Sequence, residues 1–525
     1  MSRNTRQLAK SASLISLATL LSRVLGLVRE QLIAHLFSRT ATDAFYVAFR
    51  IPNLLRDLFA EGAMSSAFVP TFTDYLTKKD RQEAWTLAST VLNLLVLVLS
   101  LITLVGILCS AQIVNMFAGH FHSVPGKFEL TVLMSQIMFP FLPLVALAAV
   151  AMGISNSHGR FFIPALAPAM FNIGSLLAAI ALYFWLLKHG LDPILGMAIG
   201  TLVGGLFQLL IQLPTIFKEG FRYSSRLAFR HPGVRRILLL LGPGTLGLAA
   251  NQINIFINTW LATSQEEGAV SWLNYAFRLM QFPIGIFGVA IATAALPTIS
   301  THVSRNETEG LRNTISSSLR MVFMVNVPAS LGLVFLSTPI ISLIYQHGRF
   351  KASDTNSTAN ALIFYSIGLF AYSAVKVLVP AFYALGRSRV PVAISAVAVS
   401  LNVALNLILI KPMGYRGLAL GTALTAILNF LLLFYWLQKY IGSLRPNLLI
   451  TSFFKVMMAS MIMGIGCFYF HQWFYLLSSS DTTVWRALVL FLSIGVGLII
   501  LFFACKLLRI SELDSAVNLV KRRLK

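Results

Sequence analysis

Long apolar stretches, separated by short polar segments, recur along almost the whole chain. Each stretch holds about 20 mainly apolar residues, the length of an α-helix that crosses the hydrocarbon core of a bilayer. Apolar and polar residues do not alternate in segments of about ten, as they do in transmembrane β-barrels. The pattern therefore predicts an all-α polytopic membrane protein with fourteen transmembrane helices. We place these spans at 11–37, 44–76, 85–117, 128–153, 161–187, 192–217, 234–262, 269–301, 314–344, 358–386, 390–410, 417–438, 449–475 and 484–508.

The composition agrees with this class. Of the 525 residues, 57% are hydrophobic and 11% are charged, and the mean hydropathy is +0.78. A soluble domain carries roughly 25% charged residues. The basic N-terminus precedes an apolar stretch, as in a signal peptide, but this stretch is too long and contains Arg23 and Arg29. We therefore interpret it as a retained first span.

The distribution of Lys and Arg predicts the orientation of the chain. With a cytoplasmic N-terminus, the cytoplasmic loops and tails hold 25 basic residues and the opposite loops hold seven. Cytoplasmic loops of membrane proteins carry such an excess. We therefore expect both termini in the cytoplasm. The same distribution accounts for most of the net charge of +23, so we expect no nucleic-acid partner.

The first twelve spans contain an internal repeat. Ala48-Phe49-Arg50 recurs as Ala276-Phe277-Arg278, and Gly159-Arg160 recurs 227 residues later as Gly386-Arg387. Because each copy has six spans, the two copies have the same orientation, as in transporters with parallel repeats. Independent selection of small residues for helix packing is the alternative. We predict lobes at 1–220 and 221–446, followed by two extra helices and a basic cytoplasmic tail at 447–525.

Three basic residues at the cytoplasmic ends of the spans, Arg235, Arg236 and Lys506, are counted with the adjoining loops. Nine others of the 41 basic residues lie inside the predicted spans. Five arginines facing lipid would cost roughly 12–17 kcal/mol even on the mildest insertion scale. They must therefore mostly face protein or water. One explanation for arginines inside the spans is that they pair with nearby acids. The other is a cationic cavity for an anionic ligand such as pyrophosphate, because the guanidinium binds phosphate through two parallel hydrogen bonds. The five arginines are Arg23, Arg29, Arg50, Arg56 and Arg278.

Helix breakers accompany these arginines: Gly26 lies between Arg23 and Arg29, and Pro52 follows Arg50. Broken helices inside a membrane usually line a cavity. Arg23 and Arg29 are separated by about 240° around a straight helix, so they converge only if the helix bends or the ligand is large. Polar groups inside spans 7, 11 and 12 act either as interhelical hydrogen-bond partners, which we favour, or as a weak cation site. They are Asn258, Asn402, Asn406 and Thr422.

Several motifs resemble the MurJ (MviN-type) family of lipid II flippases. Ser22-Arg-Val-Leu-Gly-Leu-Val-Arg29-Glu30 is similar to the family's opening motif, SRxLGxxRD. The resemblance continues through most of the first twelve spans. The matching segments are Thr42-Asp-Ala-Phe, Phe49-Arg-Ile-Pro-Asn-Leu-Leu-Arg56, Phe59-Ala-Glu-Gly-Ala63, Ala67-Phe-Val-Pro70, Val270-Ser-Trp-Leu-Asn-Tyr-Ala-Phe-Arg278, Gly348-x-Phe350 and Lys376-Val-Leu-x-Pro380.

The resemblance implies a flippase of the multidrug/oligosaccharidyl-lipid/polysaccharide exporter superfamily. Such a protein has two six-helix lobes, and two extra helices form a groove for the lipid tail. It moves lipid II, the undecaprenyl-pyrophosphate-linked peptidoglycan precursor, to the periplasmic leaflet, and it is not an enzyme. The family's cavity arginines match Arg23, Arg29, Arg56 and Arg278. Its acidic positions for gating or for orienting arginines match Glu30, Asp43 and Glu61.

Two departures from the family pattern bear on mechanism. Phe277 replaces the acid that usually precedes the span 8 arginine. Asn258 and Asn406 replace acids that bind sodium in some members, while Asn402 is retained, so sodium coupling is in doubt and drive by the membrane potential stays open. We expect no resident metal or cofactor. The expected partners are lipid II, the phospholipid bilayer and proteins of cell-wall synthesis.

Two alternatives remain at this level. One is an exporter of another polyprenyl-pyrophosphate glycolipid, or of drugs, on the same scaffold; a basic cavity disfavours cationic drugs. The other is a membrane scaffold or channel, in which the buried arginines are paired and replaceable.

Overall fold

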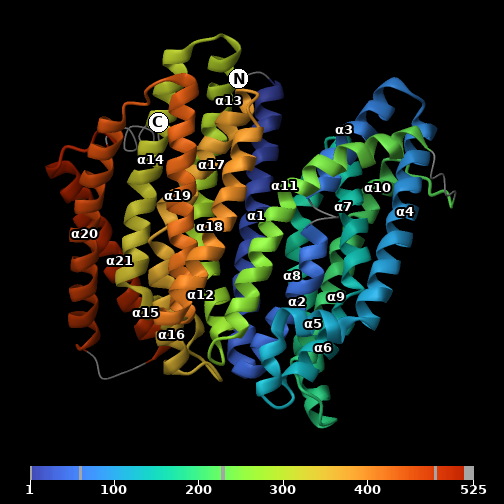
Figure 1. The fold of residues 1–525 in the computed structure, drawn as a ribbon, viewed down its shortest axis with the longest axis horizontal. Coiled ribbons are helices and arrows are strands. Elements are labelled where there is room, and N and C mark those ends of the chain that lie inside the picture. Colours follow the sequence, from blue (N-terminus) through green and yellow to red (C-terminus); the bar gives the residue numbers. More distant parts are fainter. Residues whose placement is uncertain (1–2, 58–61, 226–230, 478–481, 514–525) are drawn as a thin grey trace. The chain divides into compact units, whose positions relative to one another are not determined.

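The computed structural model consists of helices connected by short loops (Figure 1). It describes residues 3–57, 62–225, 231–477 and 482–513, and these ranges contain no β-strand. The predicted all-α class is therefore confirmed. The chain divides into two compact units, Met1–Ser271 and Trp272–Lys525.

The first unit is a helical bundle with several apolar cores. Small residues bring α8 and α9 close together: a Cβ on Gly200 would lie 2.7 Å from the backbone oxygen of Ser175. Its helices are α1 (Arg3–Leu36), α2 (Arg39–Arg56), α3 (Gly62–Lys78), α4 (Arg81–Leu108), α5 (Ser110–Ala118), α6 (Lys127–Met138), α7 (Phe141–Ser157), α8 (Phe162–Lys188), α9 (Leu195–Leu210), α10 (Leu213–Lys218) and α11 (Pro232–Thr263).

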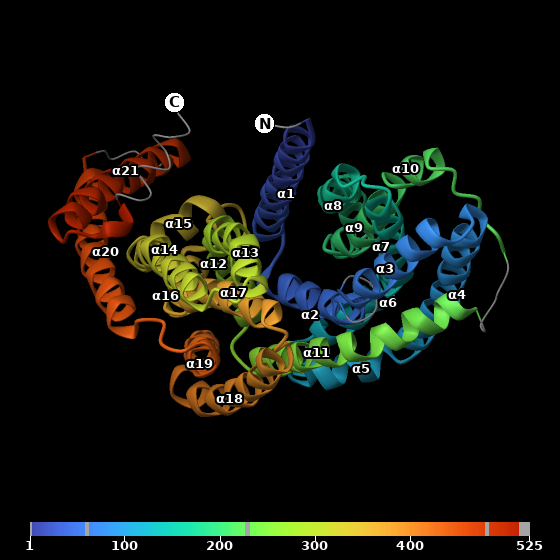
Figure 2. The ribbon, with the colours of Figure 1, turned by 90° about the horizontal axis from the view of Figure 1, so that it is seen from above.

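The second unit has one large apolar core, to which α14, α17, α19 and α20 contribute. Seen from above, α20 and α21 form a pair beside α14 (Figure 2). The boundary between the units falls inside α12 (Ala269–Pro283). The following helices are α13 (Val289–Ser304), α14 (Thr308–Phe335), α15 (Ser337–Tyr345), α16 (Ala352–Ser366), α17 (Leu369–Ala384), α18 (Arg389–Met413), α19 (Tyr415–Ile441), α20 (Pro446–Tyr475) and α21 (Thr483–Leu507).

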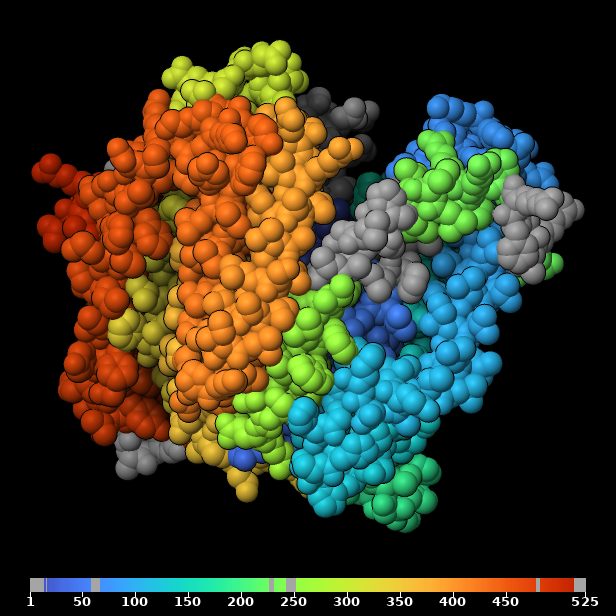
Figure 3. All heavy atoms as spheres, in the orientation of Figure 1, coloured from blue at the N-terminus to red at the C-terminus, as the bar shows by residue number. Residues whose placement is uncertain are grey.

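Many of these helices suit a membrane. In the described ranges, ten are long and apolar enough to cross one, or eleven if the bent pair α16–α17 is one span. The other three predicted spans fall on α1, on α2 with α3, and on α11, so the count of fourteen stays a prediction. Figure 3 shows α4 and α18 on the surface of the molecule. Both helices expose large apolar side chains, as lipid-facing helices do. Examples are Leu101, Leu104, Leu108, Val397 and Ile408.

The helix boundaries repeat at the spacing of the sequence repeat. The helices α4 and α14 begin 227 residues apart, and each breaks at its end and continues as a nine-residue helix, α5 or α15. The pair α6–α7 is interrupted at Phe139–Pro140, and α16–α17 at Ile367–Gly368. Each of these four pairs of helices corresponds to one predicted span. Pro140 helps to explain one break, because proline has no N–H to donate to the preceding turn.

The repeat and the compact units divide the chain at different points. By sequence, α11 is the second copy of α1, and it is the first helix of the predicted second lobe, which begins at residue 221. In space, α11 packs on α3, α4 and α5 and belongs to the first unit. The lobe boundaries at 220 and 446 describe the duplication and stay predictions.

Candidate functional site

The first predicted site residues lie where α1 faces α2 and α8. Arg29 is buried, its Nη2 donates to Glu30 Oε1 at 3.3 Å, and its guanidinium lies 5.4 Å from the ring centre of Phe171. Glu30 is 2% exposed and also accepts a hydrogen bond from the hydroxyl of Tyr46. Glu30 therefore orients Arg29, and the structure adds Tyr46, which the sequence had not singled out. Within the described residues, Arg29 Nε has no partner.

Gly26 lies inside a helix that is continuous from Arg3 to Leu36. Beside it, Asn172 Nδ2 of α8 donates to the backbone oxygen of Ser22 at 3.1 Å. That oxygen is the usual acceptor for the N–H of Gly26, so the side chain competes with the helix ladder, a known cause of helix bending. Arg23 is half-buried on the same helix. The six-residue separation therefore holds Arg23 and Arg29 on different sides of α1.

Arg56 ends α2 and is paired. Its Nη2 lies 2.9 Å from Asp57 Oδ1, and the other carboxylate oxygen of Asp57 accepts from Gln252 Nε2 of α11 at 3.3 Å. Pro52 is buried within α2, which continues through it. Acid pairing, the alternative to a free cationic cavity, therefore holds in part for Arg29 and Arg56. Glu61 lies outside the described residues.

Asp43 organises the most complete polar cluster of the first unit. The carboxylate is 1% exposed and accepts four hydrogen bonds: from Lys127 Nζ at 2.9 Å, Gly268 N at 2.8 Å, Ser271 N at 2.9 Å and Ser271 Oγ at 2.6 Å. The ammonium of Lys127 also lies 4.1 Å from the ring centre of Phe121. Asp43 therefore joins the start of α2, the start of α6 and the segment that leads into α12.

The sequence alone does not mark Lys127 as a site residue, because it lies in a loop between the predicted spans 85–117 and 128–153. Its one distinguishing signal was its place among the seven basic residues on the side that is poor in positive charge. The charge-assisted bond to Asp43 stabilises the buried ammonium of Lys127.

In the second unit, Arg278 is exposed on α12. Phe277, where the family has an acid, packs against Tyr365, with ring centres 5.3 Å apart. Earlier on the same helix, Trp272 Nε1 donates to Asp354 Oδ1 at 2.8 Å. Asp354 is 2% exposed, and its other oxygen accepts from Lys351 N at the start of α16. The helix that carries Arg278 is thus anchored to α16 at its first turn.

The amides that we considered for a cation site form a chain between α18 and α19. Asn406 Nδ2 donates to Asn402 Oδ1 at 2.9 Å, and Asn402 Nδ2 donates to Thr425 Oγ1 at 3.2 Å. Thr422 Oγ1 donates to the oxygen of Leu418 within α19. Asn258 lies on α11, in the first unit. The bond from Asn402 to Thr425 joins two helices, as the expected interhelical role requires. The bonds from Asn406 to Asn402 and from Thr422 to Leu418 stay within one helix, so a weak cation site stays open as the alternative.

These elements define a polytopic helical membrane protein with a duplicated set of broken helices, an organisation found in transporters with parallel repeats. The family described as Lipid II flippase MurJ matches residues 33–483. The chain belongs to this MurJ family.

Two curated relatives illustrate the similarity. A probable lipid II flippase MurJ of Vibrio cholerae is 37% identical over 439 residues, which are 82% of this chain and 83% of that protein. A lipid II flippase MurJ of Burkholderia cenocepacia is 38% identical over 435 residues, again 82% of this chain and 83% of that protein.

Solved structures share the fold. A lipid II flippase MurJ in an inward closed conformation matches with a TM-score of 0.78 at 28% identity, over 94% of this chain and 99% of that one. A multidrug resistance MATE family transporter in an inward-facing conformation matches with a TM-score of 0.69 at 16% identity, over 81% and 96%. At that identity, the second match shows a common fold and nothing further.

Proposed function

We propose that this protein flips lipid II from the cytoplasmic to the periplasmic leaflet of the bacterial inner membrane by alternating access. The observation that carries the proposal is the match along 94% of the chain to a lipid II flippase, together with relatives of the same description at 37% and 38% identity. Lipid II is a precursor of peptidoglycan, so the protein would act in cell-wall biogenesis and cell shape. It would be a transporter, not an enzyme.

Arginines would bind the headgroup. Arg23, Arg29, Arg56 and Arg278 stand at the family's cavity positions. Arg29 meets one neighbouring carboxylate, and within the described residues its Nε has no partner, so it can also donate to a ligand. Arg56 is paired with Asp57. A guanidinium matches the geometry of pyrophosphate with paired hydrogen bonds. Glu30 would orient Arg29, and Asp43 would hold the start of α2 during gating.

The lipid tail would stay in the membrane along α20 and α21, the pair that follows the second copy of the repeat. The excess of basic residues supports cytoplasmic termini. The drive would be the membrane potential, with sodium coupling as the weaker alternative because Asn258, Asn402, Asn406 and Thr422 offer no carboxylate. Basic cytoplasmic loops would serve for docking proteins of cell-wall synthesis.

Depletion of the protein, with complementation by variants, tests both the substrate and the arginines, and the readout is the accessibility of lipid II in each leaflet. We expect depletion to stop flipping. We expect Arg23→Ala, Arg29→Ala and Arg278→Ala to lose at least about tenfold in flipping, because each removes charge-assisted hydrogen bonds to the headgroup.

Arg486→Ala is the matched control, since Arg486 Nη1 donates to Ser342 Oγ at 3.1 Å within the second unit and has no assigned role in the cavity. This variant should flip normally. If the three site variants insert, fold and flip like the parent, the arginine mechanism is wrong, and a scaffold or channel with replaceable arginines becomes the better account. If depletion leaves lipid II flipping unchanged, the substrate is another polyprenyl-pyrophosphate glycolipid or a drug.

A further inference from the structure

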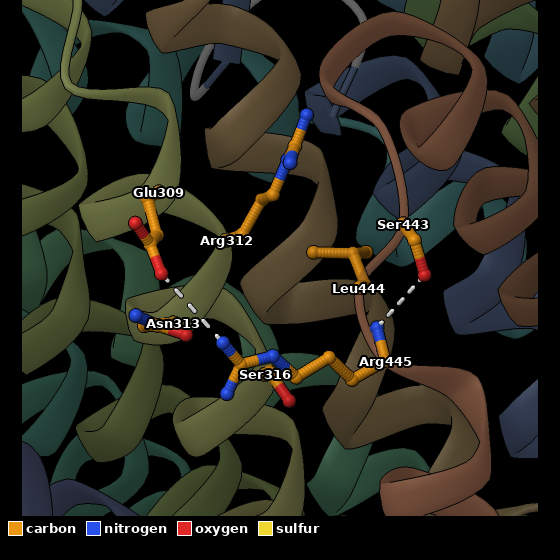
Figure 4. Close-up of a pocket in the computed structure, with 7 residues that line it drawn as sticks. All are labelled: Glu309, Arg312, Asn313, Ser316, Ser443, Leu444 and Arg445. Carbon is orange, nitrogen blue, oxygen red and sulfur yellow. Dashed lines mark hydrogen bonds and ion pairs between the residues drawn. The ribbon is translucent and has the colours of Figure 1, made fainter.

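A small polar pocket lies at the end of the second unit where α14 begins and α19 connects to α20. Its volume is about 140 Å³, enough for several water molecules or one phosphate-sized group. One face of the first turns of α14 forms one wall and the α19–α20 connection forms the other (Figure 4). The lining residues are Glu309, Arg312, Asn313, Ser316, Ser443, Leu444 and Arg445.

Ser316 marks this pocket as more than a surface hollow. The residue is 5% exposed, it lines the pocket, and among the described residues its hydroxyl has no hydrogen-bond partner. Burying a hydroxyl without a partner costs about 1–3 kcal/mol. A buried donor that faces a polar pocket is best explained by a ligand that accepts its hydrogen bond.

The equivalent place in the first copy of the repeat is occupied by different side chains. Ser89, 227 residues before Ser316, accepts a hydrogen bond from Ser224 N at 3.1 Å. Trp85, the equivalent of Arg312, fills the space with Phe221, at 5.5 Å between ring centres. One copy therefore has aromatic side chains at this place, and the other has a pocket lined by arginines.

The arginines of the pocket have separate tasks. Arg312 Nε donates to the oxygen of Ile441, at the end of α19, and a Cβ on Gly442 would lie 2.2 Å from Arg312 Nη2. In this part of the chain the offset of the repeat is 221, since Gly196-Met-Ala-Ile-Gly-Thr201 recurs as Gly417-Leu-Ala-Leu-Gly-Thr422. Gly442, with φ of +85°, is therefore the equivalent of Phe221, and a glycine makes room for this guanidinium. Arg445 lies across the opening, 3.7 Å from Glu309 in an ion pair whose side chains are 61% and 81% exposed. Such exposed pairs are weak, so Arg445 can turn to an anion.

The surroundings resemble a membrane–water interface. Lys439 Nζ lies 4.9 Å from the ring centre of Trp436, and the guanidinium of Arg387 lies 4.9 Å from the ring centre of Tyr440. Aromatic side chains collect at the level of lipid headgroups. Basic pockets between membrane helices at the cytoplasmic side bind anionic headgroups. Arg445 is also the first residue before α20, so an anion here would meet the positive end of that helix.

We propose that this pocket binds the phosphate of an anionic phospholipid headgroup. Arg445 and Arg312 supply the charge, and Asn313, Ser316 and Ser443 supply hydrogen-bonding side chains beside it. The bound lipid would fasten the start of α20 to α14, against which it packs. The cytoplasmic leaflet follows from the proposed orientation; the site itself does not depend on the substrate that the protein flips.

The test measures lipid bound to the full chain purified in detergent, by native mass spectrometry, with phosphatidylglycerol and with phosphatidylethanolamine. We expect phosphatidylglycerol to bind more tightly, and Arg445→Gln and Ser316→Val each to weaken its binding about tenfold, the effect of losing one charge-assisted or buried hydrogen bond. Arg387→Gln is the control, because Arg387 lies at the same end of the unit but does not line the pocket. It should bind like the parent.

The midpoint of thermal unfolding without added lipid shows whether each variant is folded. A folded Arg445→Lys, which keeps the charge, should regain part of the binding that Arg445→Gln loses. The proposal is overturned if both pocket variants bind phosphatidylglycerol like the parent, or if the two lipids bind equally. Binding of inorganic phosphate with the same dependence on Arg445, without a preference for phosphatidylglycerol, would assign the pocket to a free anion. Because the assay contains no lipid II, the result of the phospholipid-binding assay does not test the flippase proposal.

Discussion

Replacing Asp43 with asparagine should be among the most destabilising conservative changes in this protein. The exchange keeps an oxygen for some of the four donors around Asp43, but it removes the negative charge next to Lys127 Nζ, 2.9 Å away. The side chains of Lys127 and Asp43 are only 3% and 2% exposed, so water cannot replace the partner. Breaking a buried pair in this way costs about 3–5 kcal/mol. Native proteins are typically stable by about 5–15 kcal/mol, so the loss is a large fraction of the total.

A double-mutant cycle separates the charge from the hydrogen bonds. In Lys127→Met, the carboxylate of Asp43 keeps Gly268 N and both donors of Ser271, so we expect a loss of only about 1.5–3 kcal/mol. In the double variant, no uncompensated charge remains, and it should be more stable than Asp43→Asn alone. Chemical unfolding in detergent measures all three. The reasoning fails if Asp43→Asn costs no more than Lys127→Met, or if the double variant is no more stable than Asp43→Asn.

Two further predictions concern helix packing and pH. Gly200→Ala should destabilise the protein by about 1–3 kcal/mol, because the added Cβ would meet the backbone of Ser175. Gly495→Ala is the control and should be neutral or stabilising, because an added Cβ there has nothing within 4 Å. A midpoint of thermal unfolding that is higher for Gly200→Ala than for Gly495→Ala would contradict this. The hydrogen bond from Arg160 lowers the pKa of Glu219 below its ordinary 4.5. Above pH 4.5 the parent should therefore be more stable to unfolding than Glu219→Gln. This difference in stability should vanish as the pH falls below the lowered pKa of Glu219. A stability difference that persists at still lower pH would show that the ion pair with Arg160 is not its cause.

The sequence predicted several features of the site because each depends on neighbouring residues. Glu30 follows Arg29 directly and Asp57 follows Arg56, so pairing could be expected from adjacency alone, and both pairs are present. The pairing of Asp43 with Lys127 could not be predicted, because 84 residues separate them. The same holds for the hydroxyl of Tyr46 on Glu30, which requires α1 and α2 to lie together.

By itself, the sequence determined the helical class, the existence of a duplication and the distribution of positive charge. These follow from hydrophobic runs, from residue matches at one offset and from loop composition, all of which are local or periodic properties. The duplicated boundaries of α4–α5 and α14–α15 show how closely local sequence controls where helices end.

Tertiary structure alone decided what the two copies of the repeat became. It placed α11, the first helix of the second copy, against α3 of the first unit. In the first copy, the hydroxyl of Ser89 accepts a hydrogen bond from Ser224 N. In the second copy, the hydroxyl of Ser316 has no hydrogen-bond partner within the described residues, and it lines a pocket that also contains two arginines. The physical reason is that a hydroxyl or a buried charge must find its partner in space, and the chain brings that partner from a distant helix.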